Sequence, residues 1–312
     1  MHRRRCIDFC VYLVVRVLIG TVQALPIDTC HRLAGGLATL FCGLLGIRRR
    51  IVDDNLRQAY PQLNAAERRA LAWEMWEHLF LMVAEVAHAR RKIHITNWHR
   101  HVRFLREAEF ARHLLARRPS VIVSGHFGNF ELSGYFLGLF GFPTYSIARP
   151  LDNVYLNRFL DRFRGATGQY MLPKNGSAQQ VAVLLQQGAT LALLGDQHAG
   201  PSGCWVDFYG RPASTHKAIA LFALASDAPL LVSYCRRSGG PLLFESGLEA
   251  VADPRSPQVQ QMSVSQLTQW YTDKLAAIID RAPDQYWWLH RRWKGEPKRR
   301  TPRQERKSPP AA

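Results

Sequence analysis

The segment best suited to chemistry is V-I-V-S-G-H-F-G-N-F-E-L, residues 121–132, which places a histidine and a glutamate five positions apart. Its first three residues predict a short buried strand, and Gly125 and Gly128 favour a tight turn after it, because glycine tolerates positive φ. On one ideal helix His126 and Glu131 would lie roughly 140° apart and could not touch. We therefore predict His126 in the turn and Glu131 on the following helix, so that a carboxylate holds a histidine base.

Two further polar side chains follow predicted strands. Arg149 comes after the run 144–147, and Asp196 comes after the run 190–194. Reactive groups of α/β sheets gather at the carboxyl ends of the strands, so both side chains are expected near His126. Arg149 is a candidate to bind a substrate phosphate or to stabilise a developing oxyanion. Asp196 is a candidate to position substrate groups or to hold Arg149, with a helix cap as its alternative role.

Neighbouring polar residues have plainer interpretations. Asn129 is placed among the substrate-binding candidates, although it also suits the cap of the helix after the turn. Ser124 lies within the strand, which predicts a packed hydroxyl, and the sequence has no Gly-x-Ser-x-Gly elbow. The histidines and acids around His126 have no usual metal-ligand spacing, so no metal site is predicted. The six cysteines contain no Cys-x2-Cys pair and are expected to be buried, reduced thiols.

Beyond His126 the chain alternates between short apolar runs and amphipathic stretches. This pattern predicts an α/β fold, with a mixed or parallel sheet and helices on its faces. Helical patterns are also expected at 105–115 and over 51–89, the latter interrupted at Pro61 and restarting at Asn64. The expected strands are 121–123, 144–147, 169–172, 190–194, 230–234 and 242–244. The other expected helices are 129–139, 153–164, 178–187, 217–225 and 264–279.

The N-terminal segment is basic and then apolar. Residues 7–26 and 33–47 are largely uncharged, and the arginines 48–50 follow. A secretory signal peptide is the weaker interpretation, because Arg16 splits the first run and the second run follows at once. The second run is also shorter than the roughly 20 residues of a spanning helix. We predict two apolar helices, broken near Pro26 and seated in or on a membrane, with their arginine ends on the cytoplasmic side.

The formal charge of +17 is concentrated at the two ends of the chain. Residues 1–50 hold eight Arg against two Asp, and residues 291–312 hold nine Lys or Arg against two Glu. Basic ends beside apolar or aromatic segments suit an anionic membrane surface. Nucleic acid is not an expected partner, because zinc-finger spacing, RNP-like aromatics and a helix-turn-helix signature are missing. The aromatic and cationic stretch 283–294 is expected at the membrane interface, and the proline-rich residues 295–312 as a disordered tail.

Several motifs stand out along the chain. They are Asn55-Leu56-x2-Ala59-Tyr60-Pro61, Gly125-His126-x4-Glu131, Arg149-Pro150, Asp196-Gln197, Trp205-Val206-Asp207-Phe208-Tyr209-Gly210-Arg211 and the ending 283–294. Together they resemble the lipid A biosynthesis acyltransferases, the late lauroyl and myristoyl transferases, and the resemblance covers most of the chain. The sequence departs from the family pattern at 215–217, where the family more often has small residues and Gly or Pro. This departure concerns the preference for the acceptor or for the acyl chain length, and not the chemistry.

The resemblance implies transfer of a fatty acyl chain from an acyl thioester to a hydroxyl of a membrane glycolipid. The donor would be acyl-carrier protein or, alternatively, coenzyme A, and no metal or redox cofactor is needed. His126 would take the hydroxyl proton while Glu131 stabilises the imidazolium. Gln197 would join Arg149, Asp196 and Asn129 in binding substrate. The site would lie at the cytoplasmic face of the inner membrane.

We divide the chain into three parts. Residues 1–50 are the predicted membrane anchor, residues 51–294 the acyltransferase domain, and residues 295–312 the tail. The resemblance implies a glycerolipid acyltransferase-like fold for the second part. Two alternatives stay open, namely another lipid acceptor (a lysophospholipid, an aminolipid or a phosphoinositol mannoside) and a non-catalytic membrane-binding protein that keeps the fold.

Overall fold

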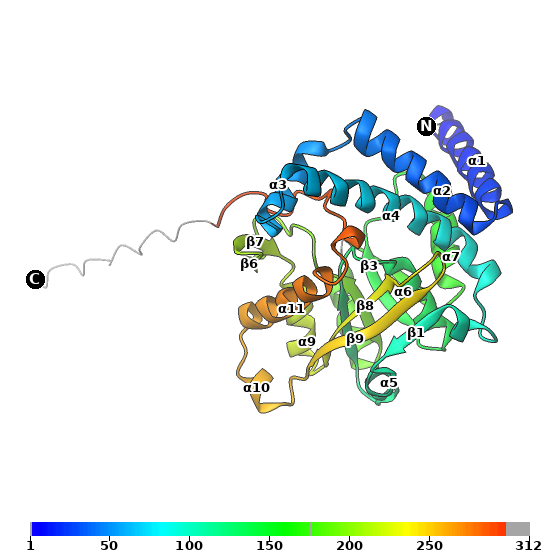
Figure 1. Cartoon of the computed structure of the whole chain (residues 1–312). Helices are drawn as coiled ribbons and strands as arrows, with labels where there is room; N and C mark the ends of the chain where they lie inside the picture. The colour runs from blue at the N-terminus through cyan, green and yellow to red at the C-terminus, as the bar shows by residue number, and fades with distance from the viewer. Residues whose placement is uncertain (1, 175, 298–312) are drawn as a thin grey trace, which may run out of the picture.

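The computed structural model describes residues 2–174 and 176–297. A seven-stranded sheet lies at the centre, with helices on its faces (Figure 1). Its strand order is β1-β9-β8-β2-β5-β3-β4, and β6 and β7 form a separate hairpin. The sheet strands are β1 (Val102–Leu105), β2 (Ser120–Ser124), β3 (Thr144–Ala148), β4 (Gln169–Pro173), β5 (Thr190–Leu194), β8 (Leu230–Arg237) and β9 (Phe244–Ala252), and the hairpin strands are β6 (Cys204–Phe208) and β7 (Arg211–Thr215).

The sheet is mostly parallel. Strands β8, β2, β5, β3 and β4 run in one direction, while β9 is antiparallel to β8 and pairs in parallel with β1. The predicted α/β class with a mixed sheet is therefore confirmed. The pattern missed β1 and the hairpin, and the strand expected at 242–244 is wrong. Leu242 has a positive φ of 59° in a turn, and β9 begins only at Phe244.

The helices outside the N-terminal segment lie close to the ranges predicted from the amphipathic pattern, except for the four-residue α10, which the pattern did not predict. The last of them, α11, packs beside α9 on one side of the sheet (Figure 1). They are α3 (Arg49–Ala59), α4 (Ala65–Lys92), α5 (Glu107–Leu115), α6 (Phe130–Leu139), α7 (Val154–Gly165), α8 (Ser177–Gln186), α9 (Ala218–Ala225), α10 (Pro257–Gln260) and α11 (Val264–Ile279).

Helix α4 is the long support along one edge of the fold. It begins with a capping box, in which the Asn64 side chain accepts from the Glu67 backbone and the Glu67 side chain accepts from the Asn64 backbone. Leu71, Met75 and Leu79 follow at helical spacing and are buried in the main core. Full burial of one such side chain stabilises the fold by about 1.5–3 kcal/mol, so this row fixes α4 on the domain.

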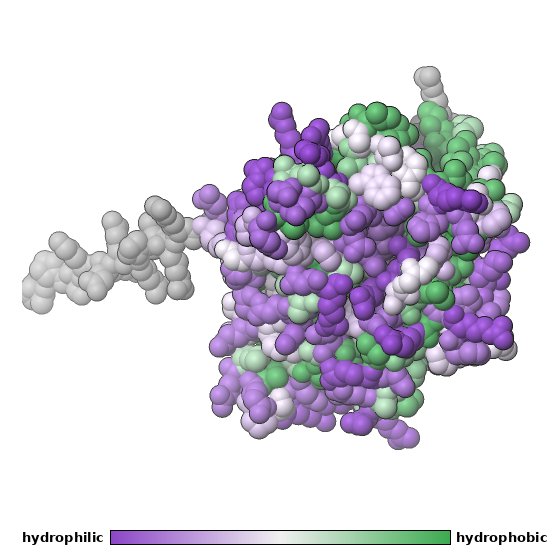
Figure 2. Space-filling view, in the orientation of Figure 1, coloured by the Kyte–Doolittle hydropathy of each residue, from purple (hydrophilic) through white to green (hydrophobic). Residues whose placement is uncertain are grey.

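The N-terminal segment forms α1 (His2–Ala24), α2 (Ile27–Ala38) and a π-helix (Thr39–Leu44). The predicted break at Pro26 is confirmed. The stretch Arg5–Ala24 has the length and apolar composition to cross a membrane. Hydrophobic residues gather over α1 and α2, whereas much of the remaining visible surface is hydrophilic (Figure 2).

The two N-terminal helices differ in how they join the domain. Helix α2 packs against α4, with Cys30 and Ala34 buried in the contact. Helix α1 lies beside α7, where the Asn153 side chain donates to the Asp8 carbonyl at 2.8 Å. The expectation of buried cysteines is wrong for α1, because Cys6 and Cys10 are exposed there. The predicted disordered tail lies almost entirely outside the described residues.

Candidate active site

The centre of the site is a histidine and an aspartate at the ends of two neighbouring parallel strands. Ser124 at the end of β2 is in register with Leu194 at the end of β5, and His126 and Asp196 each lie two residues further on. The His126 Nδ1 atom is 2.9 Å from Asp196 Oδ1, and the His126 backbone N–H donates to Asp196 Oδ2 at 2.9 Å. The strand register thus brings together two residues that are 70 positions apart.

Asp196 is an ionised, fully buried acceptor. Burial favours its neutral form, but the hydrogen bonds from His126, together with the charge of that ring when it is protonated, outweigh burial and hold the pKa of Asp196 well below its usual value. An ionised carboxylate only accepts hydrogen bonds, so the His126 Nδ1–H donates to it. The unprotonated nitrogen of the neutral imidazole is then Nε2, which is the atom that can act as a base.

The turn between β2 and α6 depends on glycine in two different ways. Gly128 has a positive φ of 58°, and a Cβ there would lie 2.1 Å from the Cys235 carbonyl oxygen. Gly125 was expected to have a positive φ as well, which is wrong. A Cβ at Gly125 would lie 3.3 Å from Asp196 Cγ, so this glycine provides space for the buried carboxylate.

Gln197 bridges two imidazoles. Its Nε2 atom lies 3.0 Å from His126 Nε2 and 2.7 Å from His290 Nε2. One side-chain amide has two N–H groups, so it can donate to both rings when each Nε2 is unprotonated. Burial, aided by nearby cations, lowers the pKa of His290 to about 4, which keeps this ring neutral at neutral pH. His290 had no predicted role of its own, since nothing in its local sequence distinguishes it from the other histidines of the chain.

The C-terminal segment closes over the His126 turn. Phe127 forms an isolated antiparallel bridge with Tyr286, and the Trp287 backbone N–H donates to the His126 carbonyl at 3.0 Å. The Trp287 ring packs 5.1 Å from the His126 ring. Tyr286 and Trp288 are buried, so the expectation that these aromatics lie at a membrane interface is wrong.

Two buried side chains hold that segment in place. Asn55 on α3 donates to the carbonyls of Trp288 at 2.7 Å and His290 at 2.6 Å, which gives the Asn-Leu motif a structural purpose. The Arg292 guanidinium donates to the Ser214 carbonyl at 2.8 Å and to Thr215 Oγ1 at 2.5 Å. The segment therefore joins α3 to the β6–β7 hairpin across the site.

A buried polar network supports the turn from the opposite side. His78 on α4 lies 3.1 Å from the Gly128 carbonyl oxygen, and the Arg237 guanidinium donates to His78 Nδ1. Arg237 in turn forms a bidentate ion pair with Glu85. Asn129 is buried here, with Oδ1 accepting from the Leu132 N–H and Nδ2 donating to Glu85. Its side chain is thus used inside the protein, as a helix cap, and the predicted substrate contact receives no support.

The predicted pairing of His126 with Glu131 is wrong. Glu131 lies in the first turn of α6, as expected, but its carboxylate accepts two hydrogen bonds from the Arg164 guanidinium on α7. A guanidinium binds both oxygens of a carboxylate at once, whereas an imidazole binds one. The partner that His126 finds is Asp196, which the sequence pattern had placed only as a possible neighbour.

Arg149 is not brought to His126. Strand β3 is in register with β5 only at Thr144 and Tyr145, so the two strands have separated before Arg149. The Arg149 side chain is 77% exposed and pairs with Asp152, three residues further on. Sequence alone places Arg149 correctly after a strand, but it cannot show that the strand end diverges.

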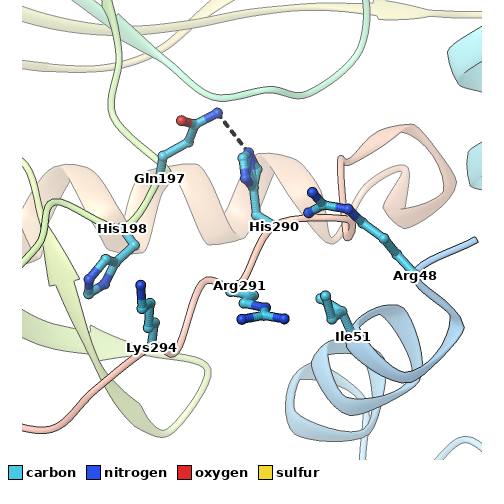
Figure 3. A pocket seen from close by; sticks show the side chains of 7 residues that line it. All are labelled: Arg48, Ile51, Gln197, His198, His290, Arg291 and Lys294. Atoms are coloured by element: carbon cyan, nitrogen blue, oxygen red, sulfur yellow. Dashed lines mark hydrogen bonds between the residues drawn. The ribbon is translucent and has the colours of Figure 1, made fainter.

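A pocket of about 520 Å³ opens beside the imidazoles (Figure 3). Gln197 and His290 form the wall that it shares with the His126 site. The close-up shows the remaining side chains converging from α3, from the loop after β5 and from the C-terminal segment. They are Arg48, Ile51, His198, Arg291 and Lys294.

The sequence is similar to known enzymes over most of its length. Residues 1–295 match the family described as bacterial lipid A biosynthesis acyltransferase. The lipid A biosynthesis lauroyltransferase of Escherichia coli (strain K12) is 26% identical over 294 residues, which cover 92% of each chain. The palmitoleoyltransferase of the same strain and a lipid A biosynthesis acyltransferase of Shigella flexneri are each 26% identical over 258 residues, or 80% of each chain.

The lowered pKa of His290 predicts a loss of stability in acid. An unfolded histidine binds a proton below pH 6.5, whereas folded His290 stays neutral down to about pH 4. The unfolded state therefore binds more protons in this window, and the free energy of unfolding falls as the pH falls. His290→Gln should reduce that slope by up to about 1.4 kcal/mol per pH unit, measured by urea unfolding in detergent from pH 7.5 to 4.5. If the free energy of unfolding depended on pH equally in the wild type and in His290→Gln, the lowered pKa of His290 would be contradicted.

Proposed function

The chain belongs to the bacterial lipid A biosynthesis acyltransferase family and is an acyltransferase, and we propose that it transfers a fatty acyl chain from an acyl thioester to a hydroxyl of a glycolipid acceptor. The observation that carries this proposal is the His126–Asp196 pair, because it leaves an unprotonated Nε2 at the edge of the sheet. The names of the E. coli relatives, a lauroyltransferase and a palmitoleoyltransferase, support a fatty acyl group as the cargo.

The proposed reaction uses one base and forms no acyl-enzyme. The acceptor hydroxyl attacks the thioester carbonyl carbon as His126 Nε2 takes its proton. Asp196 stabilises the resulting imidazolium through the Nδ1–H. Collapse of the tetrahedral intermediate breaks the carbon–sulfur bond and releases a thiolate, which takes the proton from His126 and leaves as a thiol. The products are the acylated glycolipid and the free carrier thiol.

Gln197 has a proposed role in this cycle. In the free protein its amide occupies the Nε2 atoms of both His126 and His290. An acceptor hydroxyl that donates to His126 Nε2 must replace one of these hydrogen bonds. The released N–H is then close to the reacting carbonyl and can donate to the oxyanion as charge develops there.

The donor and the setting follow from the same chemistry. An acyl-carrier-protein thioester is the proposed donor, with a coenzyme A thioester as the alternative, since either supplies the thiol leaving group. The reaction calls for neither a metal nor a redox cofactor. A lipid acceptor reaches the site from a bilayer, and the exposed apolar face of α1 supports seating at a membrane. The proposed setting is the inner membrane, with the site on its cytoplasmic side.

The base assignment is tested by substitution. His126→Ala should abolish acyl transfer while the circular dichroism spectrum is unchanged. Asp196→Asn, which no longer fixes the tautomer, should lower kcat by about 10³- to 10⁴-fold, as the equivalent change does in a serine protease. Turnover is measured by mass spectrometry of an acylated phosphoglycolipid. Near-normal turnover by folded His126→Ala would exclude the proposed base.

Glu131 keeps a proposed place in the site as the partner of Arg164. Because the pair fixes the first turn of α6 to α7, its loss should displace the groups beside His126. Glu131→Gln and Arg164→Gln should each lower kcat/KM by about 100-fold, the effect of a misplacement near 1 Å, and the double variant should be no worse. Inactivation by Glu131→Gln alone, with normal Arg164→Gln, would instead mean that Glu131 contacts the reacting groups.

Membrane seating is tested on the outward face of α1. Val14 and Val17 are exposed there, at 60% and 68%. A charged side chain in the bilayer centre costs about 2.5–3.5 kcal/mol on insertion scales, so Val14→Asp/Val17→Asp should move the protein from the membrane fraction to the soluble fraction. The matched control is Leu115→Asp/Val183→Asp, which adds the same charge to exposed positions on α5 and α8. Equal fractionation of the two variants would rule out α1 as the membrane contact.

A further inference from the structure

We propose that the pocket beside His290 is a phosphate subsite, in which Arg48, Arg291 and Lys294 bind a phosphate group carried by a substrate. The inference deepens the proposed function, on which it rests, by naming a chemical group that a substrate must carry. Two substrates of an acyl transfer reaction can bring such a group, a phosphorylated glycolipid acceptor and a donor whose thiol arm contains a phosphate.

The charge of the pocket is unbalanced. Its lining contains Arg48, Arg291 and Lys294 and no aspartate or glutamate. Within residues 2–174 and 176–297, Arg291 and Lys294 make no ion pair, and Arg48 uses its guanidinium only to donate to the Leu289 carbonyl at 2.9 Å. A pocket lined by one sign of charge attracts the opposite sign, and a phosphate can accept hydrogen bonds from all three cations.

The three cations come from two parts of the chain that are distant in sequence. Arg48 precedes α3, while Arg291 and Lys294 lie on the segment that Asn55 holds against α3. In Figure 3 the Arg48 guanidinium extends toward His290, and the Lys294 side chain lies beside His198. Because like charges repel, bringing the three cations together costs electrostatic free energy, and a bound anion offsets this repulsion.

Size and position fit a substrate group. The pocket volume of about 520 Å³ is within the usual range for ligand pockets and accommodates a sugar phosphate. Its wall contains Gln197, whose amide contacts His126 Nε2. A phosphate held in the pocket would therefore place a hydroxyl or a thioester of the same molecule at the base.

The approach to the pocket favours a lipid-borne phosphate. The residues just before Arg48 are apolar and exposed, with Leu44 at 79% and Leu45 at 56%. The chain then turns by 95° into α3, whose N-terminal end brings Arg48 to the pocket. An apolar surface followed by cations matches the order of acyl chains and phosphates in a lipid, so the acceptor headgroup is the favoured source.

The test neutralises Arg291 and Lys294, the two pocket cations whose side chains form no hydrogen bond with another described residue. In Arg291→Gln/Lys294→Gln, KM for the phosphate-bearing substrate should rise by about tenfold with kcat nearly unchanged, the pattern of lost ground-state binding. The matched control, Arg112→Gln/Arg117→Gln, removes two exposed arginines near the amino end of β2, at the opposite edge of the sheet from His126. Its kinetic constants should equal those of the wild type.

Two arms identify the source of the phosphate. In one, the glycolipid acceptor is compared with the same acceptor after phosphatase treatment; in the other, an acyl coenzyme A is compared with an acyl pantetheine, which has no phosphate. Removal of the phosphate that occupies the pocket should raise KM for the wild type. It should leave KM of the double variant unchanged, because the variant has already lost the contact to that phosphate. Effects of two changes that do not add in this way indicate a direct contact between the two groups. Equal effects of phosphate removal on variant and wild type in both arms would overturn the subsite.

A binding measurement separates this inference from the proposed function. The phosphorylated glycolipid is titrated into protein in detergent micelles without any donor, so no turnover is involved. Weaker binding by the double variant than by the Arg112→Gln/Arg117→Gln control supports the subsite even if acyl transfer fails with these substrates. Equal binding of the glycolipid by the double variant and the control overturns a subsite for the acceptor phosphate. In that case acyl transfer that still depends on His126 would leave the proposed function intact.

Discussion

The hydrogen bond between buried Asp196 and His126 is the interaction on which the site depends. A carboxylate without solvent must keep its charge through partners, and Asp196 does so by accepting from the His126 ring and from the His126 backbone. The same contact fixes the imidazole tautomer. It also explains why Gly125 precedes the histidine, since a larger residue would press on the carboxylate.

The C-terminal segment turns this pair into an enclosed site. Its backbone bonds to the His126 turn, its Trp287 ring packs on the imidazole, and its own carbonyls are held by Asn55. Behind the turn, His78 bonds to the Gly128 carbonyl from α4. His126, the proposed base, is therefore supported from both sides by buried hydrogen bonds, which suits a group whose position must be maintained within a fraction of an ångström.

The arrangement also relates the site to the apolar N-terminal helices. Helix α2 is packed on α4, the same helix that supports the His126 turn, and Arg48 follows the apolar run at the mouth of the cationic pocket. An exposed apolar surface and a pocket lined by cations are thus adjacent. This adjacency supports the proposed acceptor, an amphiphile with an anionic headgroup.

The sequence by itself determined the alternation of strands and helices, the break at Pro26 and the placement of His126 and Asp196 at strand ends, because these depend on local periodicity and on glycine and proline. Only the tertiary structure decided which acid meets the histidine. The strand order places β5 beside β2, which brings Asp196 to His126. The sequence around Glu131 does not show that its carboxylate binds the Arg164 guanidinium instead of the imidazole. Likewise, His290 reaches Gln197 from 93 residues away through packing that no local motif encodes.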